Sequence, residues 1–126
     1  MSRKRENVRQ CKAIRQLIDD NKYTKALELI DAIPLEEVGS LDDLYRYAEL
    51  YEKAERMDKK KEIFYHIYHR THSRYMLNRL LRLTIRMGDM EEARELYFAY
   101  EVAGPITLDT FELRYLLAKA EGEPPE

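Results

Sequence analysis

The sequence predicts an all-α fold of antiparallel helix hairpins that repeat along the chain, and three observations carry this prediction. The pattern N-K-Y-T-K-A at 21–26 returns as G-D-M-E-E-A at 88–93, with a degenerate copy, R-M-D-K-K-K, at 56–61. The copies end 35 and 32 residues apart, a period of two helices and a tight turn. Apolar residues recur at helical spacing. Finally, four glycines and four prolines are too few for the many turns of an all-β chain.

The first two helices are expected over about 8–20 and 23–33. Each carries one stripe of apolar residues at helical spacing. Asn21 separates the two helices, and Pro34 ends the second.

The third helix is expected to start after Ser40, whose hydroxyl can cap it, and to end near Arg56. It is apolar on two sides, which is typical of a helix sandwiched between neighbours. A fourth helix is expected over about 58–70.

The fifth helix is expected over 74–87, after Ser73, with Gly88 as the left-handed residue that ends it. A sixth is expected to end near Val102. A seventh should open with a capping box formed by Asp109 and Glu112 and end near Glu121. Outside the helical domain at 8–121, we expect a polar extension at 1–7 and a disordered tail at 122–126.

The chain resembles the tetratricopeptide repeat (TPR) proteins over about residues 8–121. The likeness is strongest at 80–97, which reads L-L-x6-G-x-M-x-x-A-x-x-x-Y and is followed by Pro105 at the family's distance, and it is weaker at 21–30. The family's large aromatic residue near the start of each repeat is replaced by Gln10, Tyr45 and Leu77 and returns as Phe111. The resemblance implies a right-handed superhelix of about three hairpins plus a terminal helix, an α-solenoid with a concave groove.

In TPR proteins the groove holds a peptide or a partner's helix, so the resemblance implies a non-enzymatic scaffold. By repeat position, the residues that would contact a partner protein are Arg15, Arg46, Lys53, Tyr75, Asn78, Arg82 and Arg86. Guanidinium groups donate hydrogen bonds to carboxylates and carbonyls, which favours an acidic partner. The chain has only scattered parts of the two-carboxylate clamp found in chaperone-binding members, so that ligand is not expected.

The stretch from Lys59 to Arg86 carries eight basic residues against one acid, Glu62. It could form an anion-binding face for an acidic peptide or for nucleic acid phosphates. The favoured alternative is a solvated face that pairs with the acids at 91–95. Nucleic acid is the weaker expectation, because residues 88–126 carry 3 basic and 10 acidic groups and no nucleic-acid motif is present.

Several classes of function find no support in the sequence. Cys11 is the single cysteine, which excludes an intrachain disulfide and a multi-cysteine zinc site. His66, His69 and His72 lack a second ligand pair, and no catalytic or cofactor-binding motif occurs, so we expect no metal, no cofactor and no catalysis. The chain lacks a signal-peptide pattern and any long apolar segment, so no membrane partner is expected and a cytoplasmic location is the default.

The seventh helix carries two apolar stripes. We expect one stripe to pack on the sixth helix; it comprises Leu108, Phe111, Tyr115 and Ala118. The other would then face away, and its leucines would form a self-association surface: Leu113, Leu116 and Leu117. A terminal helix should be polar outside, so this face indicates either further repeats beyond the C-terminus or a homodimer, and both alternatives stay open.

Overall fold

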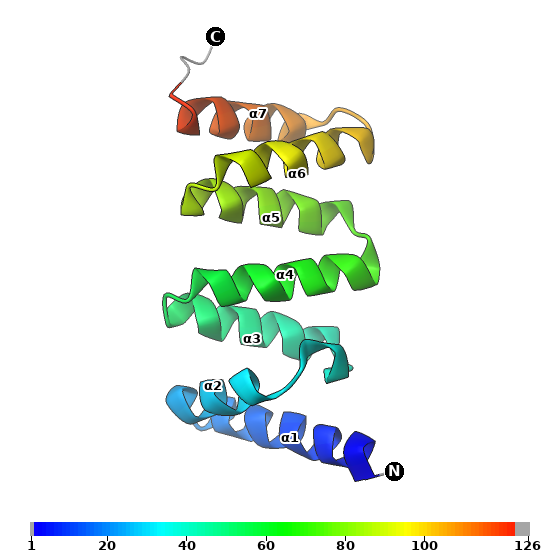
Figure 1. Cartoon of the computed structure of the whole chain (residues 1–126), viewed down its shortest axis with the longest axis vertical. Helices are drawn as coiled ribbons and strands as arrows, with labels where there is room; N and C mark the ends of the chain where they lie inside the picture. The colour runs from blue at the N-terminus through cyan, green and yellow to red at the C-terminus, as the bar shows by residue number, and fades with distance from the viewer. Residues whose placement is uncertain (1, 123–126) are drawn as a thin grey trace. The chain divides into compact units, whose positions relative to one another are not determined.

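The computed structural model describes residues 2–122, with side chains from residue 7 onward. The chain divides into two compact units, residues 1–66 and 67–126, and each is described by itself. Seven α-helices, one short 3-10 helix and no strand occur within residues 2–122 (Figure 1). The prediction of an all-helical chain is confirmed.

The helices lie close to their expected positions, with one clear exception. They are α1 (Ser2–Asp19), α2 (Tyr23–Ala32), α3 (Leu41–Lys53), α4 (Met57–Thr71), α5 (Arg74–Met87), α6 (Met90–Val102) and α7 (Leu108–Ala120), with a 3-10 turn at Leu35–Glu37. The exception is α1, which begins six residues before Val8 and takes in most of the predicted N-terminal extension. The predicted tail at 122–126 lies, apart from Gly122, outside the described residues.

In the first unit α1 packs on α2, and α2 packs on α3. The apolar core includes Ile14, Ile30, Leu44 and Tyr47, all nearly or fully inaccessible to water. Helix α3 is buried on both of its predicted apolar sides, one with Leu44, Ala48 and Tyr51 and the other with Tyr47 and Leu50. Ser40 caps α3 as predicted, because its hydroxyl accepts a hydrogen bond from the Asp43 backbone N–H at 3.3 Å.

Three hairpin turns share one backbone geometry. Asn21, Glu55 and Gly88 each adopt a left-handed conformation, with φ of 59°, 59° and 80°. In each turn the left-handed residue's N–H bonds back three residues and the next N–H bonds back five, which is the double hydrogen bond of a Schellman motif. These residues lie 34 and 33 apart in the sequence.

The shared turns correct the predicted register of the middle copy by one residue. Helices α2, α4 and α6 each begin two residues after the left-handed residue, at Tyr23, Met57 and Met90. The residue equivalent to the buried Ala26 and Ala93 is therefore Lys60, not Lys61. Lys60 is only 6% exposed, and its ammonium group forms an ion pair with Glu52. The sequence pattern missed this because a lysine at a buried position looks like a surface residue.

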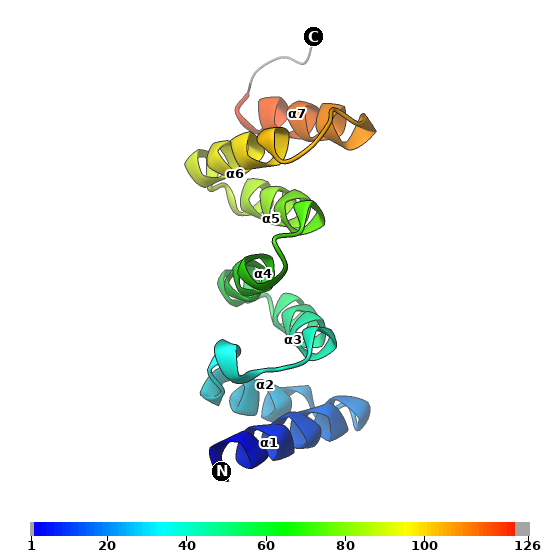
Figure 2. The same ribbon diagram turned by 90° about the vertical axis from the view of Figure 1, so that its right-hand side faces the viewer.

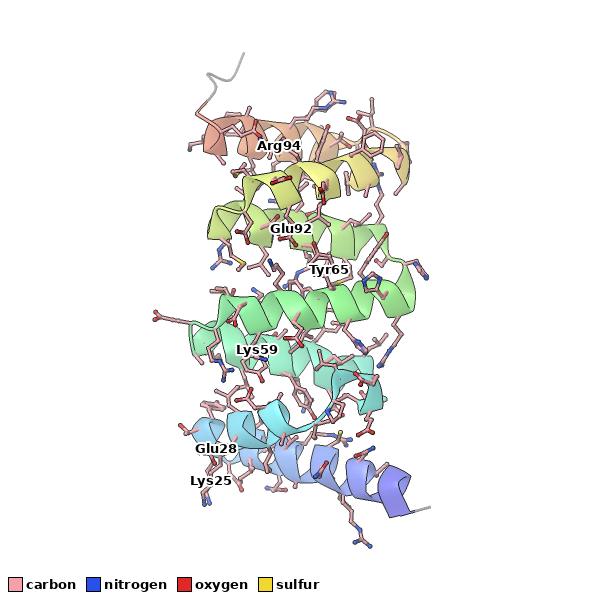
Figure 3. The ribbon with its side chains drawn as sticks, in the orientation of Figure 1. Lys25, Glu28, Lys59, Tyr65, Glu92 and Arg94 are labelled. Atoms are coloured by element: carbon pink, nitrogen blue, oxygen red, sulfur yellow. The ribbon has the colours of Figure 1, made fainter. Side chains whose placement is uncertain are left out.

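In the second unit α5, α6 and α7 pack against one another pairwise, and both views show α6 beside α7 (Figures 1 and 2). Leu80, Leu81, Leu96 and Leu113 are among the buried residues. Ion pairs join α6 to α7: Arg114 to Glu101 at 3.1 Å, and Arg94, which points from α6 toward α7 in Figure 3, to Glu121. Gly88 ends α5 as predicted.

The predicted facing of α7 is wrong. Leu113 is fully buried, while Leu108, Phe111 and Tyr115 are 87%, 57% and 47% exposed. The two apolar stripes of this helix therefore exchange the roles expected from the sequence. Both have helical spacing, so periodicity alone does not decide which one meets α5 and α6.

The predicted cap of α7 is also wrong. The helix begins after Thr107, whose backbone N–H donates to Thr110 Oγ1 at 3.0 Å. Glu112 makes no capping contact and instead pairs with Arg82 of α5. Asp89 occupies the cap position of α6 without a side-chain capping bond.

Candidate partner-binding site

Four of the seven predicted contact residues lie on α5 in the second unit. Tyr75, Asn78, Arg82 and Arg86 are spaced three or four residues apart, so they follow one face of the helix. Tyr75 and Arg86 are exposed, Arg82 is half-buried and Asn78 is buried. This face is the most concentrated set of predicted contact residues in either unit.

Arg82 is held in place by two side chains. Its Nε donates to Asn78 Oδ1 at 2.7 Å, and its Nη1 forms an ion pair with Glu112 Oε1 of α7 at 2.9 Å. The Arg82 side chain remains 35% exposed and that of Glu112 55% exposed. Because an amide already fixes one edge of the guanidinium group, its other edge is presented to a carboxylate with little loss of side-chain entropy.

Tyr75 is exposed at the start of α5. Its hydroxyl accepts a hydrogen bond from Arg79 Nη1 at 3.0 Å, and the Arg79 guanidinium lies 5.7 Å from the Tyr75 ring centroid. Arg79 thus contacts the ring through exposed interactions, and the ring stays open to solvent. An exposed tyrosine ring offers apolar contact area to a partner, and its side chain loses little conformational entropy on binding.

Arg15, Arg46 and Lys53 lie in the first unit. Arg15 of α1 forms an ion pair through Nε with Asp43 Oδ1 of α3 at 3.1 Å, and the Asp43 side chain is only 5% exposed. A buried carboxylate needs a positive partner, so Arg15 has a structural task in addition to any contact. Next to Asp43, Tyr47 is fully buried, and burial raises the pKa of its hydroxyl, which stays neutral.

The other two predicted residues of this unit are exposed. Arg46 lies on the solvent side of α3. The Lys53 ammonium group, at the end of α3, lies 5.3 Å from the ring centroid of Tyr23 at the start of α2. A cation over an exposed ring contributes only about 0.5–1 kcal/mol, so Lys53 is not strongly held there.

The basic stretch from Lys59 to Arg86 is divided between the two units. Many of its charges already have partners inside their own unit: Lys59 with Glu62, Lys60 with Glu52, Arg74 with two backbone carbonyls, Arg79 with Tyr75 and Arg82 with Glu112. Figure 3 places Lys59 at the N-terminal end of α4. Three of these cations thus have a carboxylate partner, and Arg74 and Arg79 have neutral hydrogen-bond partners.

Sequence reasoning missed two residues of the candidate site, Asp43 and Glu112. Asp43 lies in the first turn of α3, and Glu112 was expected only as part of a helix cap, yet each forms an ion pair with a predicted contact arginine. No sequence signal links Arg15 to Asp43 or Arg82 to Glu112, because the residues of each pair lie on different helices. The register of one helix against another decides which charges meet.

The predicted self-association leucines do not form an exposed seam. Leu113 is buried, and Leu116 and Leu117 are half-buried. No group of three or more histidine, cysteine, aspartate or glutamate side chains is arranged to bind a metal ion between residues 7 and 122. None of the described helices is long and apolar enough to cross a membrane.

Comparison with known proteins gave no match: no family model, no curated protein and no solved structure is significantly similar to this chain. The candidate site therefore rests on the geometry of the chain itself.

Proposed function

We propose that this chain is a TPR-like scaffold that binds an acidic segment of a partner protein, with the main contacts on α5 of the second unit. We assign it no catalytic step. The recurrence of one hairpin turn at 34 and 33 residues supports the repeat architecture, since a period near 34 is that of the TPR family. Repeat proteins of this kind present extended binding surfaces.

The observation that carries the proposal is the Asn78–Arg82–Glu112 chain of contacts. Asn78 binds one edge of the Arg82 guanidinium group, and the carboxylate of Glu112 binds the other edge at a partly exposed position. A partner carboxylate can take the place of Glu112 without any rearrangement of α5, and Glu112 is then released to water at small cost, because exposed ion pairs contribute at most about 1 kcal/mol.

The remaining residues have supporting roles in this proposal. Arg86 adds a positive charge one turn beyond Arg82, Tyr75 provides an apolar contact one turn before Asn78, and the two fix the register of the bound segment. In the first unit Arg15, Arg46 and Lys53 offer a separate set of positive contacts. Long-range attraction would bring the acidic segment to the surface, and guanidinium hydrogen bonds would then hold it.

A peptide-display selection on the wild-type chain tests the proposal. We expect selected peptides to be rich in Asp and Glu and to bind the Arg82→Glu, Arg86→Glu double variant roughly 10- to 100-fold more weakly. A control with the same change in net charge is Lys12→Glu with Lys25→Glu, at two exposed positions of the first unit. This control should retain most of the affinity.

Two outcomes would contradict the proposal. Equal weakening by both double variants would mean that only net charge matters. Displacement of the selected peptide by single-stranded poly(U) RNA at lower concentration than by free peptide would favour a nucleic-acid-binding function that uses the same arginines.

A further inference from the structure

We infer that the exposed stripe of α7 is a homodimer interface, in which α7 of one copy packs antiparallel on α7 of a second copy. The stripe consists of Leu108, Phe111 and Tyr115. This goes beyond the proposed peptide binding on α5 and concerns the opposite side of α7 from the buried Leu113.

The first support comes from the repeat. Helices α5 and α7 begin 34 residues apart, at Arg74 and Leu108, so Phe111 is equivalent to Leu77 and Tyr115 to Leu81. Leu77 and Leu81 are 3% and 0% exposed in the second unit, where α6 packs against α5. The same two positions on α7 carry larger apolar side chains and remain exposed. The stripe thus stands at positions that neighbouring structure covers in α5 and that are left open in α7.

The second support is that the stripe also has the spacing of a covering helix. The buried residues of α6 are Ala93, Leu96 and Tyr100, at positions i, i+3 and i+7. Leu108, Phe111 and Tyr115 have the same spacing. The stripe thus resembles the buried face of α5 in its positions and that of α6 in its spacing. A surface with the features of both packing partners can pack against a copy of itself, as an interface with two-fold symmetry requires.

The third support is the charge pattern along α7. Its first half carries Asp109 and Glu112, and Lys119 stands in its last turn. An antiparallel pair places the acidic first half of each helix near Lys119 of the other, whereas a parallel pair would bring like charges together. The Lys119 ammonium lies 5.9 Å from the Tyr115 ring centroid and the Arg114 guanidinium 5.6 Å from that of Phe111, so cations flank both rings of the stripe.

Light scattering coupled to size exclusion over a wide range of concentrations tests the inference. We expect the wild-type chain to form a dimer, and Phe111→Glu with Tyr115→Glu to weaken dimerisation roughly 100-fold or more, because two aromatic anchors are replaced by charges at the centre of the contact. The matched control is Tyr75→Glu with Val8→Glu, which changes two other exposed apolar side chains and the same net charge. The control should dimerise as the wild type does.

Circular dichroism of each variant separates loss of pairing from loss of folding. Should the double variant unfold, Leu108→Lys serves instead, since that side chain is 87% exposed and contributes little to the core of the second unit. A wild-type chain that stays monomeric at the highest concentration overturns the inference. So does a folded Phe111→Glu, Tyr115→Glu or Leu108→Lys variant that remains as dimeric as the control.

Discussion

The guanidinium group of Arg74 occupies the space that a β-carbon at position 104 would need. A β-carbon built on Gly104 would lie 2.8 Å from Arg74 Nη1 and 3.0 Å from Cζ. Arg74 donates from Nε to the Tyr100 carbonyl at 3.0 Å and from Nη1 to the Pro105 carbonyl at 2.8 Å, and its guanidinium lies 4.0 Å from the Tyr100 ring centroid. One side chain thus ties the start of α5 to the end of α6 and to the loop before α7.

Gly104→Ala is therefore expected to destabilise the second unit by about 1–2 kcal/mol, because Arg74 must give up at least one hydrogen bond. Urea denaturation measures the change. Gly39→Ala is the control, since no atom lies within 4 Å of its added β-carbon. Equal stabilities of the two alanine variants would show that Arg74 does not hold the loop.

Leu113→Ala is expected to cost about 2–4 kcal/mol of unfolding free energy, the usual cost of a cavity in a packed core. Leu108→Ala, five residues earlier on the opposite side of α7, should change stability by less than about 0.5 kcal/mol. Thermal or urea unfolding of the two variants checks the facing of α7. A larger loss of stability in Leu108→Ala than in Leu113→Ala would mean that the stripe with Leu108 is the buried one, as the sequence predicted.

Glu55→Gly is expected to stabilise the first unit by about 0.5–1 kcal/mol. Glu55 has a left-handed backbone with φ of 59°, a conformation that costs a side-chain-bearing residue energy and that glycine adopts freely. At the equivalent turn, Gly88→Ala should destabilise by a similar amount. A loss of stability in Glu55→Gly would mean that the Glu55 side chain stabilises the folded state by more than its left-handed backbone destabilises it.

Removing the two partners of the Lys60–Glu52 ion pair should have unequal effects. Glu52→Gln leaves the buried Lys60 ammonium without its charge partner and is expected to cost about 1–3 kcal/mol. Lys60→Met replaces the ammonium with an apolar group of similar length and should be nearly neutral. Denaturant unfolding of both variants tests this, and a larger loss in Lys60→Met would show that the pair is stabilising in its own right.

The contribution of Asp31 to stability should depend on pH. Asp31 accepts hydrogen bonds from Arg56, at 3.0 Å, and from Tyr51, and the bond from Arg56 is the main cause that lowers the pKa of Asp31 below its usual 3.8. A lowered pKa in the folded state means that the stabilisation is present above about pH 4 and is lost as the pH falls through the folded-state value.

Asp31→Asn should consequently be less stable than the wild type at pH 7, by about 1 kcal/mol or less, because the pair is partly exposed. The difference should shrink as the pH falls below about 4. Parallel unfolding curves at pH 7 and pH 3 measure it, with Asp42→Asn, at an exposed position, as the control. A difference that is the same at both pH values would exclude a role for the Asp31 charge.

Sequence reasoning named the contact residues of the candidate site but not the acids that pair with its arginines. The resemblance names Tyr75, Asn78, Arg82 and Arg86 by repeat position, and their spacing of three or four residues puts them on one face of α5, because spacing within a helix is a local property. The acids that hold the arginines, Asp43 and Glu112, come from other helices. Their role depends on how the helices are packed, which no short sequence pattern encodes.

The positions of the helices and of their turns followed from short sequence patterns. Apolar periodicity, Pro34 and Gly88 act over a few residues, and the residues that carry them form the same elements in the structure. The packing of the helices against one another selected the buried stripe of α7 and brought Lys60 into the core of the first unit. A helix with two apolar stripes can bury either one, and the shape and charge of its neighbours select between them.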